Sequence, residues 1–467
     1  MISRIGAFKI NPIKRSDSWK LCDFIIANLW FKMCKKAILL FVFLIVVNQV
    51  SAQLVYDTPE SVGLNAIYIE SNVDSIINDA ITKKAFPGAQ LLVAKQGKII
   101  FHKAYGFHTY DSIQKVNLDD VYDLASVTKI TGPLPALMKL YEEGKINLDV
   151  PFSNYWKSWR NRKDKKDITL RELLSHQAGM TPYIVFLRDV LRNGKPKTRF
   201  IKRESKTRYS NKVSNKLYVK NRFNQKVFRK IKRSKISEEK TYLYSGLASL
   251  IYPTLIENIT GKNYEDYLIN NFFERLGTVT LGYNPLTKNL KNNIVPTELD
   301  TFFRKSLLKG YVHDENAALL GGISGNAGLF ATAKDMAIYM QMLLQKGTYN
   351  GKQYFKTSTV DEFTKIQYPK NKNRRGLGFD KPIIGNDTLS IAKAYPAPQV
   401  SPQSFGHSGF TGTFVWADPE HELVFIFLSN RVYPSRTHSN IYNFNVRPKL
   451  QQVFYTCPKF EEKLTNN

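Results

Sequence analysis

Ser126-Val127-Thr128-Lys129 follows a short strand-like segment and opens a run with helical periodicity. On a helix, residues three positions apart share a face, so the Lys129 amine would lie over the Ser126 hydroxyl. A serine hydroxyl is a weak nucleophile unless a base takes its proton, and an uncharged lysine can be that base. The positive end of the helix dipole would favour the oxyanion formed on attack. The stretch therefore predicts a nucleophile at Ser126.

The Ser-x-x-Lys spacing needs its context, because it occurs five times in the chain. These occurrences begin at Ser112, Ser126, Ser237, Ser306 and Ser390. Ser112 lies in a polar turn, Ser237 lies in a basic stretch, and the run after Ser390 meets Pro396, where a helix cannot continue. Ser306 comes late in the chain and has only one further element after it. Ser126 alone starts a helix and precedes both Tyr244-Ser245-Gly246 and His407-Ser408-Gly409.

With these three stretches in this order, the chain resembles the serine β-lactamase, penicillin-binding protein and esterase superfamily. It is most similar to the branch that holds class C β-lactamases and related esterases. In that family the serine is acylated, and the lysine and the tyrosine share the acid–base work. The resemblance implies Ser126 as nucleophile, Lys129 and Tyr244 as acid–base partners, and His407 as the catalytic residue of the third element. No cofactor is implied, and no metal site is expected, because the seven histidines include no His-x-x-x-His pair.

The resemblance also implies a substrate-binding wall at Gly409 and Phe410, with the N–H groups of Ser126 and Phe410 as the oxyanion hole. It extends over roughly residues 60–450. Two departures stand out. Gly246 replaces the Asn or Asp that usually ends the tyrosine box, which removes an amide that would hold substrate or steady the lysine. Pro133 and Pro135 fall in the helix after the serine, so we expect that helix to be short or kinked.

Strand-like runs occur near both ends of the mature chain. Residues 89–94 and 98–102 read as a hairpin around Lys95-Gln96-Gly97, and residues 412–417 and 423–429 form a second pair. Residues 71–83, 126–180, 246–275 and 332–346 are predicted to be mostly helical. The fold class is therefore α/β (α+β): an antiparallel sheet built from both termini, flanked by helices, with an inserted, mostly helical lobe.

An export signal is predicted at the start of the chain. Lys35-Lys36 precedes 11 apolar residues, which are too few to cross a bilayer, and Val50-Ser51-Ala52 is a small-residue cleavage pattern. The alternative, a buried core helix, does not explain the dibasic flank. We expect residues 1–52 to be a signal peptide with a possibly over-extended N-terminus, and Met33 to be the alternative start. The mature chain, residues 53–467, would be secreted or periplasmic, without a stable membrane anchor.

The mature chain is poor in cysteine. Of the three cysteines only Cys457 remains after cleavage, so no intrachain disulfide and no cysteine-based metal site is expected. The seven histidines include no His-x-x-x-His pair. Residues 313–316, His-Asp-Glu-Asn, pack polar groups closely, and we expect a hydrogen-bonded loop near the cleft there.

The chain is strongly basic, with 68 Lys and Arg against 39 Asp and Glu and a formal charge of +29. Residues 188–240 concentrate this charge, with 20 basic and 4 acidic residues. One interpretation is a site for an anionic envelope polymer, and the other is a solvated insertion on the helical lobe. Its aromatic residues indicate partial packing. Nucleic acid is not expected as a partner of an exported protein.

Taken together, the sequence predicts an exported serine hydrolase that cleaves ester or amide bonds through an acyl-enzyme on Ser126, with deacylation by water. One alternative is a true β-lactamase or D-Ala-D-Ala peptidase acting on a peptidoglycan-like substrate. Another is a non-catalytic envelope-binding protein that uses residues 188–240. Histidine at 407 is a weaker cation than lysine, which favours neutral or bulky acyl substrates over penicillin-like carboxylates.

Overall fold

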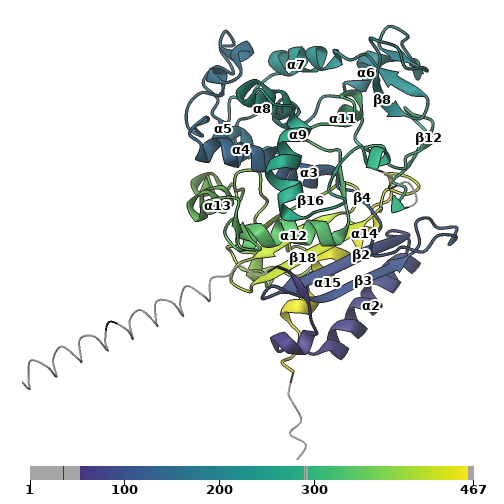
Figure 1. Ribbon diagram of the computed structural model, residues 1–467, viewed down its shortest axis with the longest axis vertical. Coiled ribbons are helices and arrows are strands. Elements are labelled where there is room, and N and C mark those ends of the chain that lie inside the picture. Colours follow the sequence, from purple (N-terminus) through teal and green to yellow (C-terminus); the bar gives the residue numbers. More distant parts are fainter. Residues whose placement is uncertain (1–34, 36–52, 289, 291–292, 461–467) are drawn as a thin grey trace, which may run out of the picture. The chain divides into compact units, whose positions relative to one another are not determined.

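Strands from opposite ends of the chain pair with one another in a six-stranded sheet (Figure 1). The computed structural model describes residues 35, 53–288, 290 and 293–460, and the predicted signal peptide lies outside them apart from Lys35. The sheet order is β1-β3-β2-β18-β17-β16, antiparallel except for the β1–β3 pair. The strands are β1 (Val55–Tyr56), β2 (Gly88–Lys95), β3 (Lys98–Gly106), β16 (Phe405–Ser408), β17 (Phe414–Asp418) and β18 (Leu423–Ser429). The predicted sheet built from both termini is confirmed.

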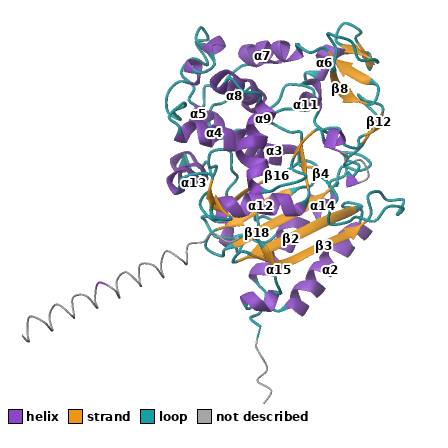
Figure 2. Cartoon of the chain, in the orientation of Figure 1, coloured by secondary structure: helices purple, strands orange, loops and turns teal. Residues whose placement is uncertain are grey.

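Both faces of this sheet are covered, which explains the nearly continuous apolar runs in its central strands. Successive side chains point to opposite faces, so Leu91 and Phe427 pack with α2 (Ala66–Thr82) and α15 (Val446–Tyr455). Leu92 and Ile426 face the other way, into the larger core that contains α12 (Ala333–Leu344) and the helical lobe. Figure 2 shows helices on both sides of the orange strands.

Two local predictions need adjustment. The first helix begins at Ala66 rather than Ser71, because the Asn65 side chain accepts a hydrogen bond from the Tyr68 N–H and caps it. The predicted three-residue turn has only Gln96 and Gly97 outside the strands, both at positive φ (53° and 75°). Such a two-residue turn matches the twist of a hairpin.

The lobe above the sheet in Figure 1 is built from short helices and small sheets. Its helices are α3 (Thr128–Thr131), α4 (Pro133–Glu142), α5 (Leu170–Leu174), α8 (Tyr252–Thr260), α9 (Tyr264–Leu268), α10 (Glu274–Leu276) and α11 (Glu315–Leu319). Two small sheets are β10 (Gly282–Tyr283) with β13 (Leu329–Ala331) and β4 (Tyr122–Asp123), and β11 (Leu299–Asp300) with β12 (Ser306–Leu307). The remaining elements are α13 (Thr357–Thr364), α14 (Asn440–Asn443), β14 (Thr348–Tyr349) and β15 (Lys352–Gln353). No helix in the described ranges is both long and apolar enough to span a bilayer.

The basic insertion, residues 188–240, is a packed unit that carries more strand than expected. It contains α7 (Phe223–Arg233), the end of α6 (Leu187–Val190), the β5–β6 hairpin (Leu191–Arg192 and Lys195–Pro196), and a sheet of β7 (Ile201–Lys202), β9 (Leu217–Val219) and β8 (Asn211–Ser214). Its apolar side chains join the main core, as the aromatic content predicted. Those buried are Val190, Ile201, Val213, Leu217, Val219, Phe223, Val227 and Ile231.

Phe223→Ala tests whether the insertion belongs to the folded core. Phe223 is 2% exposed and meets the Phe200 ring edge-on at 5.9 Å, so truncation leaves a cavity. We expect the free energy of unfolding to fall by about 3–5 kcal/mol in chemical denaturation. Phe302→Ala, the same change at a 61% exposed position, should alter it by no more than about 0.5 kcal/mol. Equal, small effects would show that the insertion does not contribute to the core.

Candidate active site

Ser126 and Lys129 meet as the Ser-x-x-Lys spacing predicted. Ser126 lies in a 3-10 turn, Ala125–Val127, between β4 and α3. The Lys129 Nζ donates a hydrogen bond to the Ser126 Oγ at 2.9 Å and another to the backbone oxygen of Asn326 at 3.1 Å. Lys129 is only 8% exposed. A buried amine in hydrogen-bond contact with a hydroxyl is placed to exchange a proton with it.

The backbone before Ser126 is held in an unusual conformation. Ala125 has φ of +46°, a left-handed value that costs energy for a residue with a Cβ. Its N–H donates to the Asp123 carboxylate at 2.8 Å, and that carboxylate also accepts from the His313 N–H at 2.6 Å. Burial raises the pKa of Asp123, while these two N–H groups act against that rise. Asp123 therefore fixes the turn that presents the serine.

The helix after Ser126 is broken, as its prolines predicted. α3 ends at Thr131, and α4 begins at Pro133 after a turn at Gly132. A Cβ at Gly132 would lie 2.8 Å from the Tyr283 hydroxyl and 2.9 Å from the Tyr264 hydroxyl, so only glycine fits there. With α3 only four residues long, the expected helix dipole contributes little, and oxyanion stabilisation depends on individual N–H groups.

Tyr244 lies beside this pair. Its ring centroid is 5.4 Å from the Lys129 Nζ and 5.7 Å from the Arg375 Cζ, so both basic side chains lie close to the ring. Arg375 is buried and forms an ion pair with Asp380, and His176 packs on the tyrosine ring at 4.4 Å. The phenolic oxygen has no hydrogen-bond partner among the residues that the structure describes. It is therefore available to a substrate.

His407 lies behind Tyr244, with 6.2 Å between the ring centroids, and it is buried. Its Nδ1 donates to the backbone oxygen of Ser408 at 2.7 Å, which leaves Nε2 without a proton in the neutral ring. Burial, helped by the Arg375 charge, lowers the pKa of His407 to about 3. The side chain is therefore neutral at physiological pH. We expected a weaker cation than lysine, and the buried ring carries no positive charge at all.

Gly409 allows the third element to approach the serine. A Cβ there would lie 2.5 Å from the backbone oxygen of Leu124, next to the turn that holds Ser126. The Thr411 hydroxyl donates to the backbone oxygen of Asp123 at 2.7 Å, and the Thr413 hydroxyl donates to that of Leu124 at 3.1 Å. Gly409 thus contributes close packing, and neither it nor His407 lines the cavity in front of Ser126.

Phe410 does line that cavity, and its backbone N–H is the second group that the resemblance assigns to the oxyanion hole. Within the described part of the chain, neither the Ser126 N–H nor the Phe410 N–H has a hydrogen-bond acceptor. The loop that carries Phe410 is fixed by Arg431, whose Nε donates to the Phe410 oxygen at 2.7 Å and whose guanidinium lies 4.3 Å from the ring centroid. Two unpaired N–H groups at one cavity suit a developing negative charge.

The cavity has a volume of about 520 Å³, within the range of small-molecule sites. Ser126, Lys129, Tyr244 and Phe410 all line it. The other lining residues are Ala125, Pro182, Tyr183, Val185, Leu187, Gly246, Phe302, His313, Asp314, Glu315, Asn326, Ala327 and Arg436.

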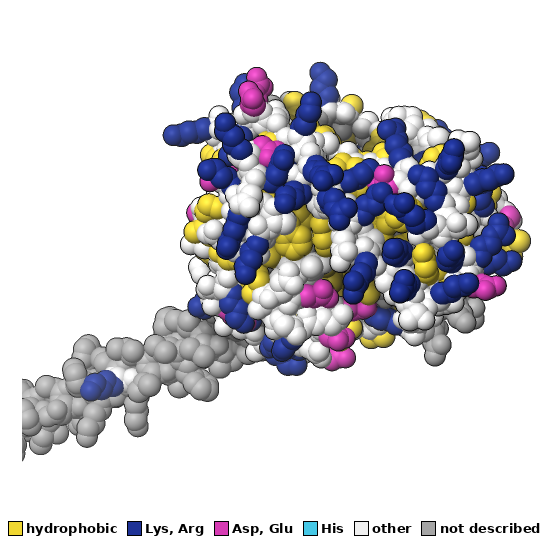
Figure 3. Space-filling model, turned by 90° about the horizontal axis from the view of Figure 1, so that it is seen from above, with side chains coloured by type: hydrophobic (Ala, Val, Ile, Leu, Met, Phe, Trp, Pro, Cys, Tyr) yellow, Lys and Arg dark blue, Asp and Glu magenta, His cyan; other side chains and the backbone are white. Residues whose placement is uncertain are grey.

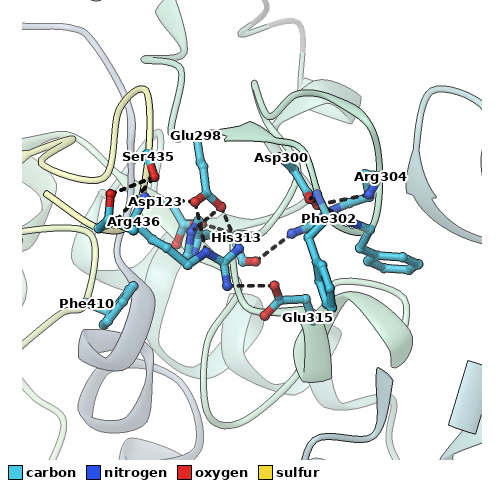
Figure 4. A network of polar contacts seen from close by, with 12 residues as sticks. Asp123, Glu298, Asp300, Phe302, Arg304, His313, Glu315, Phe410, Ser435 and Arg436 are labelled. Carbon is cyan, nitrogen blue, oxygen red and sulfur yellow. Dashed lines mark hydrogen bonds and ion pairs between the residues drawn. The ribbon is translucent and has the colours of Figure 1, made fainter. Parts of the chain in front are cut away.

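One wall of the cavity is a polar network (Figure 4). The His313 Nε2 contacts Glu298 at 2.9 Å, and the Arg436 guanidinium bridges Glu298 and Glu315 at 2.6 and 2.8 Å. Asp314 accepts from the Ala317 N–H and the Asn326 amide. The polar contacts predicted at residues 313–316 are present, but only His313 and Asp314 lie in a loop, because Asp314 caps α11 and Glu315 and Asn316 belong to that helix. No grouping of three His, Cys, Asp or Glu suited to a metal occurs in the ranges that the structure describes.

Gly246 leaves open space beside Lys129, at the position where the family usually has an Asn or Asp side chain. The nearest atom to a Cβ placed there is the Lys129 Cε at 3.9 Å. The amide missing from the tyrosine box is thus not replaced at that position, and the Asn326 carbonyl supplies the second hydrogen bond to Lys129 instead.

Sequence reasoning missed the roles of His176, Asn326, Arg375 and Arg431. His176, Asn326 and Arg431 lie within residues 60–450, the part of the chain over which the resemblance extends. Their contacts depend on segments that are distant in sequence, so no local spacing revealed them. Arg375 carried no signal, because it follows Arg374 in one of the many basic stretches of a basic chain.

This fold and this arrangement of serine, lysine and tyrosine define the class, a β-lactamase-like serine hydrolase. The Beta-lactamase family model matches residues 73–446, so the chain belongs to that family. An Escherichia coli (strain K12) protein named "Putative D-alanyl-D-alanine carboxypeptidase" is 29% identical over 405 residues, covering 81% of this chain and 86% of that protein.

Two solved structures share the fold. EstCE1, described as a hydrolase with promiscuous acyltransferase activity, has a TM-score of 0.59 and 16% identity, covering 82% of this chain and 98% of its own. A class C β-lactamase from Rhodobacter sphaeroides has a TM-score of 0.56 and 15% identity, covering 82% of this chain and 99% of its own.

His407→Asn tests the neutral histidine. Below pH 6.5 the unfolded chain protonates this residue and the folded chain does not until about pH 3, so stability falls as pH drops through that window. Asparagine retains a donor for Ser408 but takes up no proton. Plots of unfolding free energy against pH should therefore be shallower for the variant by about 1.4 kcal/mol per pH unit. Equal slopes for the variant and the wild-type protein would contradict the assignment.

Proposed function

We propose that the protein is an exported serine hydrolase that cleaves an ester or amide bond through an acyl-enzyme on Ser126. The observation that carries the proposal is the 2.9 Å contact between the Lys129 Nζ and the Ser126 Oγ at a cavity that Tyr244 also lines. The unpaired N–H groups of Ser126 and Phe410 support it.

In the acylation step the Ser126 Oγ attacks the substrate carbonyl carbon and loses its proton to the uncharged amine of Lys129. The carbonyl oxygen becomes an oxyanion, which the N–H groups of Ser126 and Phe410 stabilise. As the intermediate collapses, the leaving group takes the proton held by Lys129, either directly or through the hydroxyl of Tyr244. Lys129 must release that proton to regain its basic form.

In the deacylation step a water molecule attacks the acyl carbonyl, and the serine oxygen leaves. The same amine and phenol take the proton of the water and return one to Ser126. Both steps use only residues that line the cavity, through their side chains or backbone N–H groups, together with substrate and water. Asn326 and Asp123 act as positioning residues, the first on Lys129 and the second on the turn that carries Ser126.

The substrate class follows in part from the relatives. A protein named as a D-alanyl-D-alanine carboxypeptidase supports a peptidoglycan-like amide, and a β-lactam remains the second candidate. Export supports either, because such substrates lie outside the cytoplasm. The proposed location, periplasmic or secreted, depends on the basic flank, the 11-residue apolar run and the small-residue cleavage pattern in residues 35–52.

A second function, binding to an anionic envelope polymer, is proposed for the insertion. Its apolar residues face the core, which leaves its cations outside, and Figure 3 shows Lys and Arg spread over the upper face of the molecule. Arg208, Lys220 and Arg222 line one surface cavity with Thr207 and Asn221. Three cations around a concavity without an acidic side chain favour a polyanion.

Labelling tests the nucleophile. A fluorescent fluorophosphonate should label the wild-type protein lacking residues 1–52, and Ser126→Ala should lose the label because the attacking oxygen is gone. Ser112→Ala, at a second Ser-x-x-Lys occurrence, is the matched control and should label normally. Labelling of the Ser126 variant would show that another residue is the nucleophile. Absence of label on all three proteins would favour the alternative of a non-catalytic envelope-binding protein.

Salt-dependent retention on teichoic acid resin tests the insertion. The variant Arg208→Gln/Lys220→Gln/Arg222→Gln should elute at clearly lower salt than wild type, because each lost ionic contact reduces the salt dependence of binding to a polyanion. Lys262→Gln/Lys352→Gln/Lys370→Gln removes the same charge at exposed positions outside the insertion. Equal elution of the two variants would reject a localised site.

A further inference from the structure

Large apolar side chains surround the cavity mouth in front of Ser126. Tyr183, Val185, Phe302 and Phe410 all line the cavity and are 40–61% exposed. Water contact with this much apolar surface is unfavourable, and a cluster of such residues at one concavity marks a binding site. The residues come from three separate segments, so the cluster is a product of the fold rather than of one apolar stretch.

Phe302, the most exposed of them, is held rigidly. It lies in the turn between β11 and β12, where the Asp300 carboxylate accepts from the N–H groups of residues 302, 303 and 304. Arg304 forms a fully buried ion pair with Asp300, and its other nitrogens donate to the backbone oxygens of Val312 and His313 (Figure 4). This turn fixes an aromatic ring at the cavity while leaving it uncovered.

The charges around the cavity do not suit an anionic group. Arg436 is bound to two carboxylates, Glu298 and Glu315, and so is already neutralised. His407 is neutral, with its pKa lowered to about 3 by burial. Among the described residues that line the cavity, Lys129 is the one basic side chain without a carboxylate partner, and its amine is hydrogen-bonded to Ser126 and Asn326. A substrate carboxylate would meet Asp314 and Glu315 instead.

We infer that the acyl group of the substrate is uncharged and apolar, and that Phe302 is a specificity-determining residue that contacts it. The acyl group is assigned to the apolar wall because it stays attached to Ser126 until deacylation, whereas the leaving group departs. This inference rests on the proposed acyl-enzyme function, narrows its substrate class to esters or amides of apolar acids, and therefore disfavours the peptidoglycan-like amide and the β-lactam named above.

A series of p-nitrophenyl esters tests the inference. With wild-type protein, kcat/KM for the octanoate should exceed that for the acetate by about tenfold or more, because added methylenes gain burial in an apolar pocket. Phe302→Ala should lower the octanoate-to-acetate ratio about tenfold. Phe460→Ala, the same change at an exposed phenylalanine away from the cavity, should leave the ratio unchanged.

A matched pair of substrates separates the effect of acyl-group charge from the effect of chain length. The p-nitrophenyl hexanoate and the mono-p-nitrophenyl adipate have the same chain length and differ by a terminal carboxylate, and the hexanoate should be preferred by about tenfold or more. Equal rates for acetate and octanoate, an unchanged ratio in Phe302→Ala, or preference for the adipate would each overturn the inference, while Ser126-dependent hydrolysis would leave the proposed function standing. Hydrolysis that persists in Ser126→Ala would overturn the function itself.

Discussion

The hydrogen bond between the Lys129 amine and the Ser126 hydroxyl constrains the surrounding fold. A buried lysine is costly unless its amine has partners, and here they are one hydroxyl and one carbonyl, the latter from Asn326 about two hundred positions along the chain. The break at Gly132 lets α3 pack against two buried tyrosines, and Gly409 lets the C-terminal strand pair approach the turn that carries Ser126. The two glycines allow close packing around the Ser126–Lys129 pair, and the Asn326 carbonyl accepts a hydrogen bond from Lys129.

The site lies where the terminal sheet meets the helical lobe. β16 forms the sheet edge that brings in Phe410, β4 leads directly to Ser126, and the lobe contributes Tyr244 and the polar wall around His313. Each wall has its own internal support: Arg431 for the Phe410 loop, Arg375 and His176 for Tyr244, and Asp300 with Arg304 for Phe302. The catalytic groups can therefore remain in place although most of them lie on loops or short turns.

Much of this was predictable from sequence because it is local or periodic. The Ser126–Lys129 contact follows from helical spacing, the hairpin of β2 and β3 from its Gln-Gly turn, and the terminal sheet from two pairs of apolar runs. The kinked helix followed from Pro133 and Pro135. The neutral state of His407 could not be predicted from the sequence, because it depends on burial and on Arg375, which lies 32 positions away in the chain and is brought near by the fold. The exposed ring of Phe302 was not predictable either, since the sequence does not show which of the two adjacent residues, Phe302 or Phe303, is buried.

Mass spectrometry of the protein quenched during turnover of an activated ester tests the central claim most directly. The account predicts an intact-mass increase equal to the acyl group, located by peptide mapping on Ser126, which forms rapidly and disappears as substrate is exhausted. An acyl group found on another residue, or ester hydrolysis at full rate without any covalent adduct even when deacylation is slowed by low temperature, would contradict it.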